Sequence, residues 1–97
     1  IIRVHSEEEA LAVANDSEYG LSAAVYSRDS ARAWNVTQRL HTGICHINGP
    51  TVHDEAQMPF GGCKASGYGR FGGRAGIAEF TELRWITIQT QPRELPF

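Results

Sequence analysis

The sequence lacks an excess of basic charge, and it has no long apolar run. Nine Lys and Arg residues stand against eleven Asp and Glu, which gives a formal net charge of −2. Nucleic acids and anionic membranes attract proteins mainly through clustered positive charge, so neither is an expected partner. No apolar stretch approaches the ~20 residues of a membrane helix, and the N-terminus lacks the basic and apolar regions of a signal peptide.

Cysteine and methionine are also scarce. Cys45 and Cys63 are too few for a disulfide scaffold, which favours a reducing, cytoplasmic compartment. The chain starts at Ile1 and its single methionine is Met58, so we expect a piece of a longer reading frame. Its 97 residues are about two-thirds of a typical domain of ~150 residues. A chain of this size has a modest core and gains from contact with a partner surface.

What the sequence does contain is an alternation of strand-like and helix-like segments. Runs rich in alternating or β-branched apolar residues cover 1–5, 21–27 and 44–48. Two apolar repeats of helical period lie between these runs. Ser6 is expected to cap the first helix and Asp29 or Ser30 the second, with Gly43 as the left-handed residue that ends the second. Strands that alternate with such helices pair in parallel, so we predict the α/β class with a parallel β-α-β-α-β unit.

The second half of the chain changes character after Asn48. Residues 49–73 are expected to form a long loop, and seven of the ten glycines fall within 61–76. A short helix is expected around 74–82, followed by a β-prone segment at 83–90 and an extended tail. Long loops in compact domains are usually functional or disordered. The chain is therefore divided into 1–82 and 83–97.

One glycine pattern has the letters of a dinucleotide-binding fingerprint. Residues 67–72, Gly-Tyr-Gly-Arg-Phe-Gly, match G-x-G-x-x-G. That fingerprint follows a hydrophobic strand, whereas here the polar and glycine-rich stretch 61–66 precedes it. Tight turns and close backbone approach are the favoured explanation for these glycines.

Other catalytic and metal patterns fail on their spacing. No structural zinc spacing relates the four candidate ligands Cys45, His46, His53 and Cys63. Ser66, His53 and Asp54 have the letters of a hydrolase triad, but Ser66 is not in G-x-S-x-G and the other two are sequence neighbours. No residue beside Cys45 plainly activates its thiol. The sequence therefore predicts no catalytic residue and no metal ligand within this chain.

Three longer strings resemble a known family. They are A-N-D-S-E-Y-G-L-S-A at 14–23, G-I-C-H-I-N at 43–48 and P-F-G-G-C-K-A-S-G-Y-G-R at 59–70. In this order they resemble the C-terminal part of the NAD(P)-dependent aldehyde dehydrogenase superfamily, and the resemblance runs nearly end to end. A narrower resemblance, to the branch of benzaldehyde, vanillin and salicylaldehyde dehydrogenases, lies in residues 48–58 and 89–93. Members of that branch often have a hydrophobic residue in place of Cys63, which suggests a packing role for it.

The resemblance implies oxidation of an aldehyde to its carboxylic acid. In the family a cysteine thiolate forms a hemithioacetal, hydride passes to the nicotinamide, and a glutamate activates the hydrolytic water. It also implies that the nucleophilic cysteine, the oxyanion-hole asparagine, the base glutamate and the cofactor motif lie upstream of Ile1. NAD or NADP would then be bound mainly by residues outside this chain, and the chain alone would be inactive.

The resemblance further implies two structural roles for this segment. The loop after Asn48 and the phenylalanine of P-F-G-G line the substrate tunnel in the family, which points to Thr51, Val52, His53 and Phe60 as substrate-binding residues. Core packing is the alternative role for Phe60. For His53 both roles stay open, because the alignment register of the loop is not fixed. The strand at 84–90 would pair with a neighbouring subunit in a homo-oligomer, a dimer or a tetramer; an edge strand in its own sheet is the alternative.

Three other functions remain open at this point. The chain could be a non-catalytic α/β binding or regulatory module, a small nucleotide-binding domain that uses 67–72, or part of a CoA-acylating aldehyde dehydrogenase. An aldehyde dehydrogenase acting on an aromatic aldehyde is the favoured function.

Overall fold

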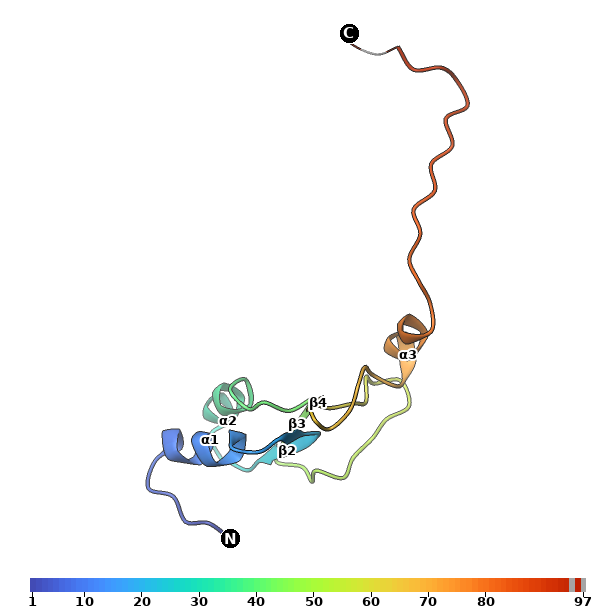
Figure 1. Cartoon of the computed structure of the whole chain (residues 1–97). Coiled ribbons are helices and arrows are strands. Elements are labelled where there is room, and N and C mark those ends of the chain that lie inside the picture. The colour runs from blue at the N-terminus through green and yellow to red at the C-terminus, as the bar shows by residue number, and fades with distance from the viewer. Residues whose placement is uncertain (95, 97) are drawn as a thin grey trace.

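The structure is a computed structural model that describes residues 1–94 and 96. A body of helices and short strands leads into an extended C-terminal segment that points away from it (Figure 1). The radius of gyration is 21.0 Å and the principal extents are 71 × 33 × 27 Å. A compact chain of about 100 residues has a radius near 13 Å. Much apolar surface is therefore uncovered: among the described residues, Leu11 and Ala33 are the buried hydrophobic ones, at 5% and 0% exposure.

The first helix, α1 (Glu7–Asn15), starts where its capping sequence predicts. The Ser6 hydroxyl accepts a hydrogen bond from the Glu9 backbone N at 3.1 Å, and the Glu9 carboxylate accepts one from the His5 backbone N at 2.8 Å. The strand predicted for 1–5 is absent, and that prediction is wrong. Among the described residues no strand pairs with the backbone groups of this segment, and Ile1 and Ile2 are exposed.

The second helix and two strands form one parallel unit. β2 (Ser22–Val25) pairs in parallel with β3 (Ile44–Ile47), and α2 (Ser30–Thr37) crosses over between them with Asp29 as its N-cap. The α2 residue Ala33 has no exposed surface, which suits the close approach of α2 to both strands. The α/β class is thus confirmed, with a single β-α-β unit in place of the longer one because the first strand does not form.

Ion pairs join the two helices at the surface. Arg32 Nε lies 2.7 Å from a Glu7 carboxylate oxygen, and Arg39 donates to Glu8. The hydrogen bond and positive charge from Arg39 lower the pKa of Glu8 below its ordinary value. Because these groups are open to solvent, such pairs orient the helices more than they stabilise the fold.

A second sheet was not predicted from the sequence. β1 (Tyr19–Gly20) pairs antiparallel with β4 (Cys63–Lys64), and the Ser66 hydroxyl accepts a hydrogen bond from the Gly20 backbone N at 2.8 Å. These contacts bring the glycine-rich stretch back to the connection between α1 and β2. Gly43 lies at this junction without the left-handed backbone predicted for it, since α2 ends at Thr37.

The last helix, α3 (Gly73–Glu79), confirms the short helix expected near 74–82, although it ends earlier. Residues 83–94 form neither helix nor strand, so the strand predicted at 84–90 does not form within the chain. Leu83, Trp85, Ile86 and Ile88 are exposed there. The tail predicted for 95 and 97 lies outside the described residues. In the described part of the chain, no helix is long and apolar enough to cross a membrane.

Candidate substrate-pocket wall

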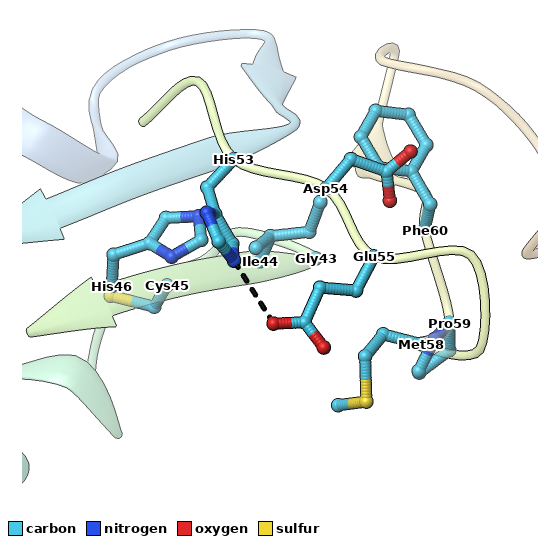
Figure 2. A pocket seen from close by; sticks show the side chains of 10 residues that line it. All are labelled: Gly43, Ile44, Cys45, His46, His53, Asp54, Glu55, Met58, Pro59 and Phe60. Carbon is cyan, nitrogen blue, oxygen red and sulfur yellow. Dashed lines mark hydrogen bonds and ion pairs between the residues drawn. The ribbon is translucent and has the colours of Figure 1, made fainter. Parts of the chain in front are cut away.

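A pocket of about 410 Å³ lies between β3 and the loop that follows it. Figure 2 shows the side chains that line it, with the two histidine rings at one end and Phe60 at the other. The apolar part is made by Ile44, Met58, Pro59 and Phe60, and the polar part includes His46, His53 and Glu55. Ligand pockets are usually mostly apolar with a few polar groups, and this one has that composition.

The polar end joins a strand residue to two loop residues. The rings of His46 and His53 meet edge to face, with centroids 5.7 Å apart and planes at 80°. His53 Nε2 lies 3.3 Å from Glu55 Oε1. His46 Nε2 is buried, and it has no hydrogen-bond partner among residues 1–94 and 96. A buried polar atom without a partner costs about 1–3 kcal/mol, so this nitrogen is suited to a partner from outside the described residues.

The thiol of Cys45 also borders the pocket. Partial burial raises the pKa of this thiol above its ordinary value, and a hydrogen bond with the His46 backbone opposes the rise only in part. Only a thiolate attacks a carbonyl carbon, so a raised pKa makes Cys45 a poor nucleophile. The absence of a catalytic cysteine from this chain stays a prediction.

Of the four residues predicted to line a substrate tunnel, the structure brings two to the pocket. His53 and Phe60 line it. Thr51 does not: it lies against β2, where its carbonyl oxygen accepts a hydrogen bond from the Ser22 hydroxyl at 3.0 Å. Val52 is also outside the pocket and is 90% exposed.

Three ionisable pocket residues, His46, Asp54 and Glu55, were not predicted as substrate contacts. His46 was considered only as a zinc ligand. It stands near the carboxyl end of a strand in a parallel pair, which is where open α/β sheets bind ligands, and this position was the available signal. Glu55 carries no such signal, because its place depends on the path of an irregular loop.

Both ends of this loop are fixed by hydrogen bonds. At its start Asn48 adopts a left-handed backbone (φ 56°), and its amide accepts from the Ser27 N at 2.9 Å and donates to the Ser27 O at 3.0 Å. At its end Phe60 and Phe71 exchange two backbone hydrogen bonds of 2.8 and 2.7 Å. These contacts set the position of Phe60 at the edge of the pocket.

The glycine-rich stretch is held in place by the charged residues of its own motif. Arg70 Nη1 donates to the carbonyl oxygens of Gly62 and Gly69 at 2.7 and 2.8 Å. Lys64 Nζ donates to the Asn15 and Ser17 carbonyl oxygens, near the end of α1, at 2.8 and 2.9 Å. A cation is favourable where a helix leaves its last carbonyls unpaired. Lys64 thus ties the glycine-rich stretch to the end of α1.

The residues around 67–72 do not fit the pyrophosphate of a dinucleotide. A Cβ at Gly69 would meet the Glu79 carboxylate, whose Oε1 accepts a hydrogen bond from the Arg70 backbone N at 3.2 Å. A carboxylate in that place repels phosphate. The preceding strand, β4, has two residues and is antiparallel, unlike the strand of a dinucleotide fingerprint. Among the described residues, no group of three or more His, Cys, Asp or Glu side chains is arranged to hold a metal ion.

Residues 1–86 match the Aldehyde dehydrogenase family. The chain therefore belongs to that family, which confirms the resemblance found in its three strings.

Individual relatives are similar over the whole chain. The vanillin dehydrogenase of Pseudomonas sp. (strain HR199 / DSM 7063) is 65% identical over 96 residues, which are 99% of this chain and 20% of that protein. The salicylaldehyde dehydrogenase of Pseudomonas sp. (strain C18) is 53% identical over 97 residues, 100% of this chain and 20% of that protein. A crystal structure of a salicylaldehyde dehydrogenase from Pseudomonas putida G7 complexed with salicylaldehyde matches with a TM-score of 0.90 at 54% identity, over 99% of this chain and 20% of that one. The chain thus spans about a fifth of the length of the relatives that it matches.

Proposed function

We propose that this chain forms one wall of the substrate pocket in an enzyme that oxidises an aromatic aldehyde to its carboxylic acid with NAD or NADP. The observation that carries the proposal is the pocket between β3 and the loop, where Phe60 stands with Ile44 and Met58. Aromatic rings pack against one another with about 0.5–1.5 kcal/mol beyond the burial of their area. The relatives named for vanillin and salicylaldehyde support an aromatic substrate.

In this proposal the chain shapes and orients the substrate and does not attack it. The raised pKa of Cys45 argues against a nucleophilic role for that thiol. NAD or NADP supplies the hydride acceptor when bound, and residues outside these 97 hold it, since the stretch at 67–72 does not fit a pyrophosphate. The nucleophile and the base are likewise supplied by residues outside this chain. These 97 residues alone are therefore inactive.

The proposal also assigns a role to the extended segment. Residues 84–90 pair with a sheet of a neighbouring subunit, and the enzyme is a homo-oligomer. Support comes from the exposed, β-prone side chains of Trp85, Ile86 and Ile88, which find no cover within the described chain.

The test uses a complete enzyme in which this chain replaces the matching fifth of the Pseudomonas vanillin dehydrogenase, called the chimera below. We expect the chimera to produce NADH or NADPH from aromatic aldehydes and the 97-residue chain alone to produce none. Phe60→Ala should lower kcat/KM for benzaldehyde by about three- to tenfold, because an aromatic contact is lost. An aliphatic aldehyde should lose less.

Phe80→Ala is the matched control, since Phe80 is 85% exposed and lies at the end of α3, outside the pocket. Unchanged kinetics in a stably folded Phe60→Ala chimera would remove Phe60 from the substrate wall. An inactive chimera, or NADH production by the isolated chain, would contradict the proposed function as a whole.

A further inference from the structure

The polar end of the pocket has unused hydrogen-bonding capacity. We call His46, His53 and Glu55 the polar corner; Figure 2 shows them together, with Phe60 at the far end of the pocket. His46 comes from β3, whereas the other two come from the loop. Two separate parts of the chain therefore bring polar groups to the same place.

The hydrogen bond inside the corner is a weak one. His53 Nε2 and Glu55 Oε1 are 3.3 Å apart, beyond the usual range of an N–H···O bond. The second carboxylate oxygen, Oε2, accepts from Gln57 Nε2 at 2.6 Å, which fixes the carboxyl group while Oε1 remains available. The side chains of His53 and Glu55 are about half exposed, at 55% and 49%, so a ligand can reach them.

The buried Nε2 of His46 is the second observation. It has no partner within the part of the chain that the structure describes, and the ring of His53 packs edge-on against the same imidazole. A neutral imidazole has one donor and one acceptor nitrogen, so the histidine pair can either donate to or accept from a hydroxyl group.

We propose that the polar corner recognises a phenolic hydroxyl on the ring of the aromatic aldehyde. This inference rests on the proposed function. The ring packs against Phe60, its hydroxyl donates to Glu55 Oε1, and the hydroxyl oxygen accepts from His53. A site built to hydrogen-bond a hydroxyl group discriminates against the analogue that lacks it. The negative charge of Glu55 also opposes a ring substituent that is itself an anion, such as a carboxylate.

The test measures kcat/KM of the chimera for ortho- and para-hydroxybenzaldehyde, for benzaldehyde and for para-carboxybenzaldehyde. His53→Phe keeps an aromatic ring and removes its nitrogens, and Glu55→Gln keeps an oxygen and removes the charge. We expect each variant to lower the preference for a hydroxylated ring over benzaldehyde by about tenfold, as for loss of a hydrogen bond to a charged group. Glu55→Gln should in addition raise kcat/KM for the carboxylate.

His5→Phe is the matched control, because His5 is exposed and does not line this pocket. It should leave the hydroxyl preference unchanged. If both corner variants keep the preference of the parent chimera while all three enzymes oxidise benzaldehyde, the inference is wrong and the proposed function stands. If the parent chimera oxidises no aromatic aldehyde, both the inference and the proposed function are wrong.

Discussion

At the scale of single residues, Cys45 shows how position controls the chemistry of a side chain. Cys45 lines the pocket, and the family resemblance implies a reaction that uses a cysteine nucleophile. Burial nevertheless raises the pKa of the Cys45 thiol. The folded chain thus holds the proton more tightly than the unfolded chain does. Protonated Cys45 contributes to stability below the ordinary pKa of the thiol, and this contribution is lost as the pH rises through the folded value.

This shift predicts slow alkylation of Cys45. The rate of iodoacetamide labelling should rise with pH about a midpoint that lies higher in the folded chimera than in the same protein in urea, because only the thiolate reacts. Peptide mass spectrometry separates Cys45 from other cysteines. A folded midpoint at or below the urea midpoint would contradict the burial argument.

Of the four residues predicted to bind substrate, two line the pocket and two lie outside it. Phe60 is placed by a backbone pairing with Phe71 next to its own motif, and His53 reaches the same pocket from the loop. Thr51 and Val52 were chosen from the same loop and lie outside the pocket, because the side-chain directions of an irregular segment follow no period. The assignment of all four to substrate binding stays a prediction.

At the scale of elements, local signals were the dependable ones. Ser6 and Asp29 each accept a backbone hydrogen bond from the residue three positions later, and such caps can be recognised from neighbouring residues alone. The pairing of β1 with β4 joins Tyr19 to Lys64 and Gly20 to Cys63, which are 45 and 43 positions apart, and it has no local signal. The strand predicted at 1–5 fails for the related reason that a strand needs a partner.

The close packing at Gly43 gives an element-scale prediction. A Cβ at this position would collide with the carbonyl oxygen of Gly61 and lie 2.8 Å from Gly62 Cα. Gly43→Ala should therefore lower the stability of the chimera by about 1–3 kcal/mol, because a backbone contact must move apart. Thermal unfolding measures the change.

Gly49→Ala is the control for this substitution, since the nearest atom to its new Cβ would be His46 Cβ at 3.8 Å. It should change stability by no more than about 0.5 kcal/mol. Equal effects of the two substitutions would show that the β3 start and the glycine-rich stretch are not in close contact.

At the scale of the whole molecule, the extended shape and the uncovered apolar side chains belong together. A radius of gyration of 21.0 Å leaves residues 83–94 without contacts that would cover Trp85, Ile86 and Ile88. The residues of this segment favour a strand, but none forms within the described chain, because a strand needs a partner to pair with. Its pairing with a neighbouring subunit stays a prediction.

The oligomer proposal predicts that one proline in this segment weakens assembly. Thr87→Pro removes a backbone donor from the expected strand, so light scattering should show a smaller particle than the parent chimera. Glu94→Pro, beyond the segment, should leave the particle mass unchanged. A monomeric parent chimera, or a Thr87→Pro variant of unchanged mass, would contradict pairing through 84–90.

The two fixed ends of the pocket loop have a consequence for how such a pocket can change. The hydrogen bonds between Asn48 and Ser27 and those between Phe60 and Phe71 involve no side chain from residues 49–59. Within the loop, the Thr51 carbonyl oxygen accepts from the Ser22 hydroxyl and the Ala56 carbonyl oxygen accepts from the Gly73 backbone N. Loop closure entropy rises slowly with length, so residues 49–59 can be replaced by a sequence of different length that keeps these two backbone acceptors. New sequences can be installed there to fit a different substrate while the framework beneath keeps its shape.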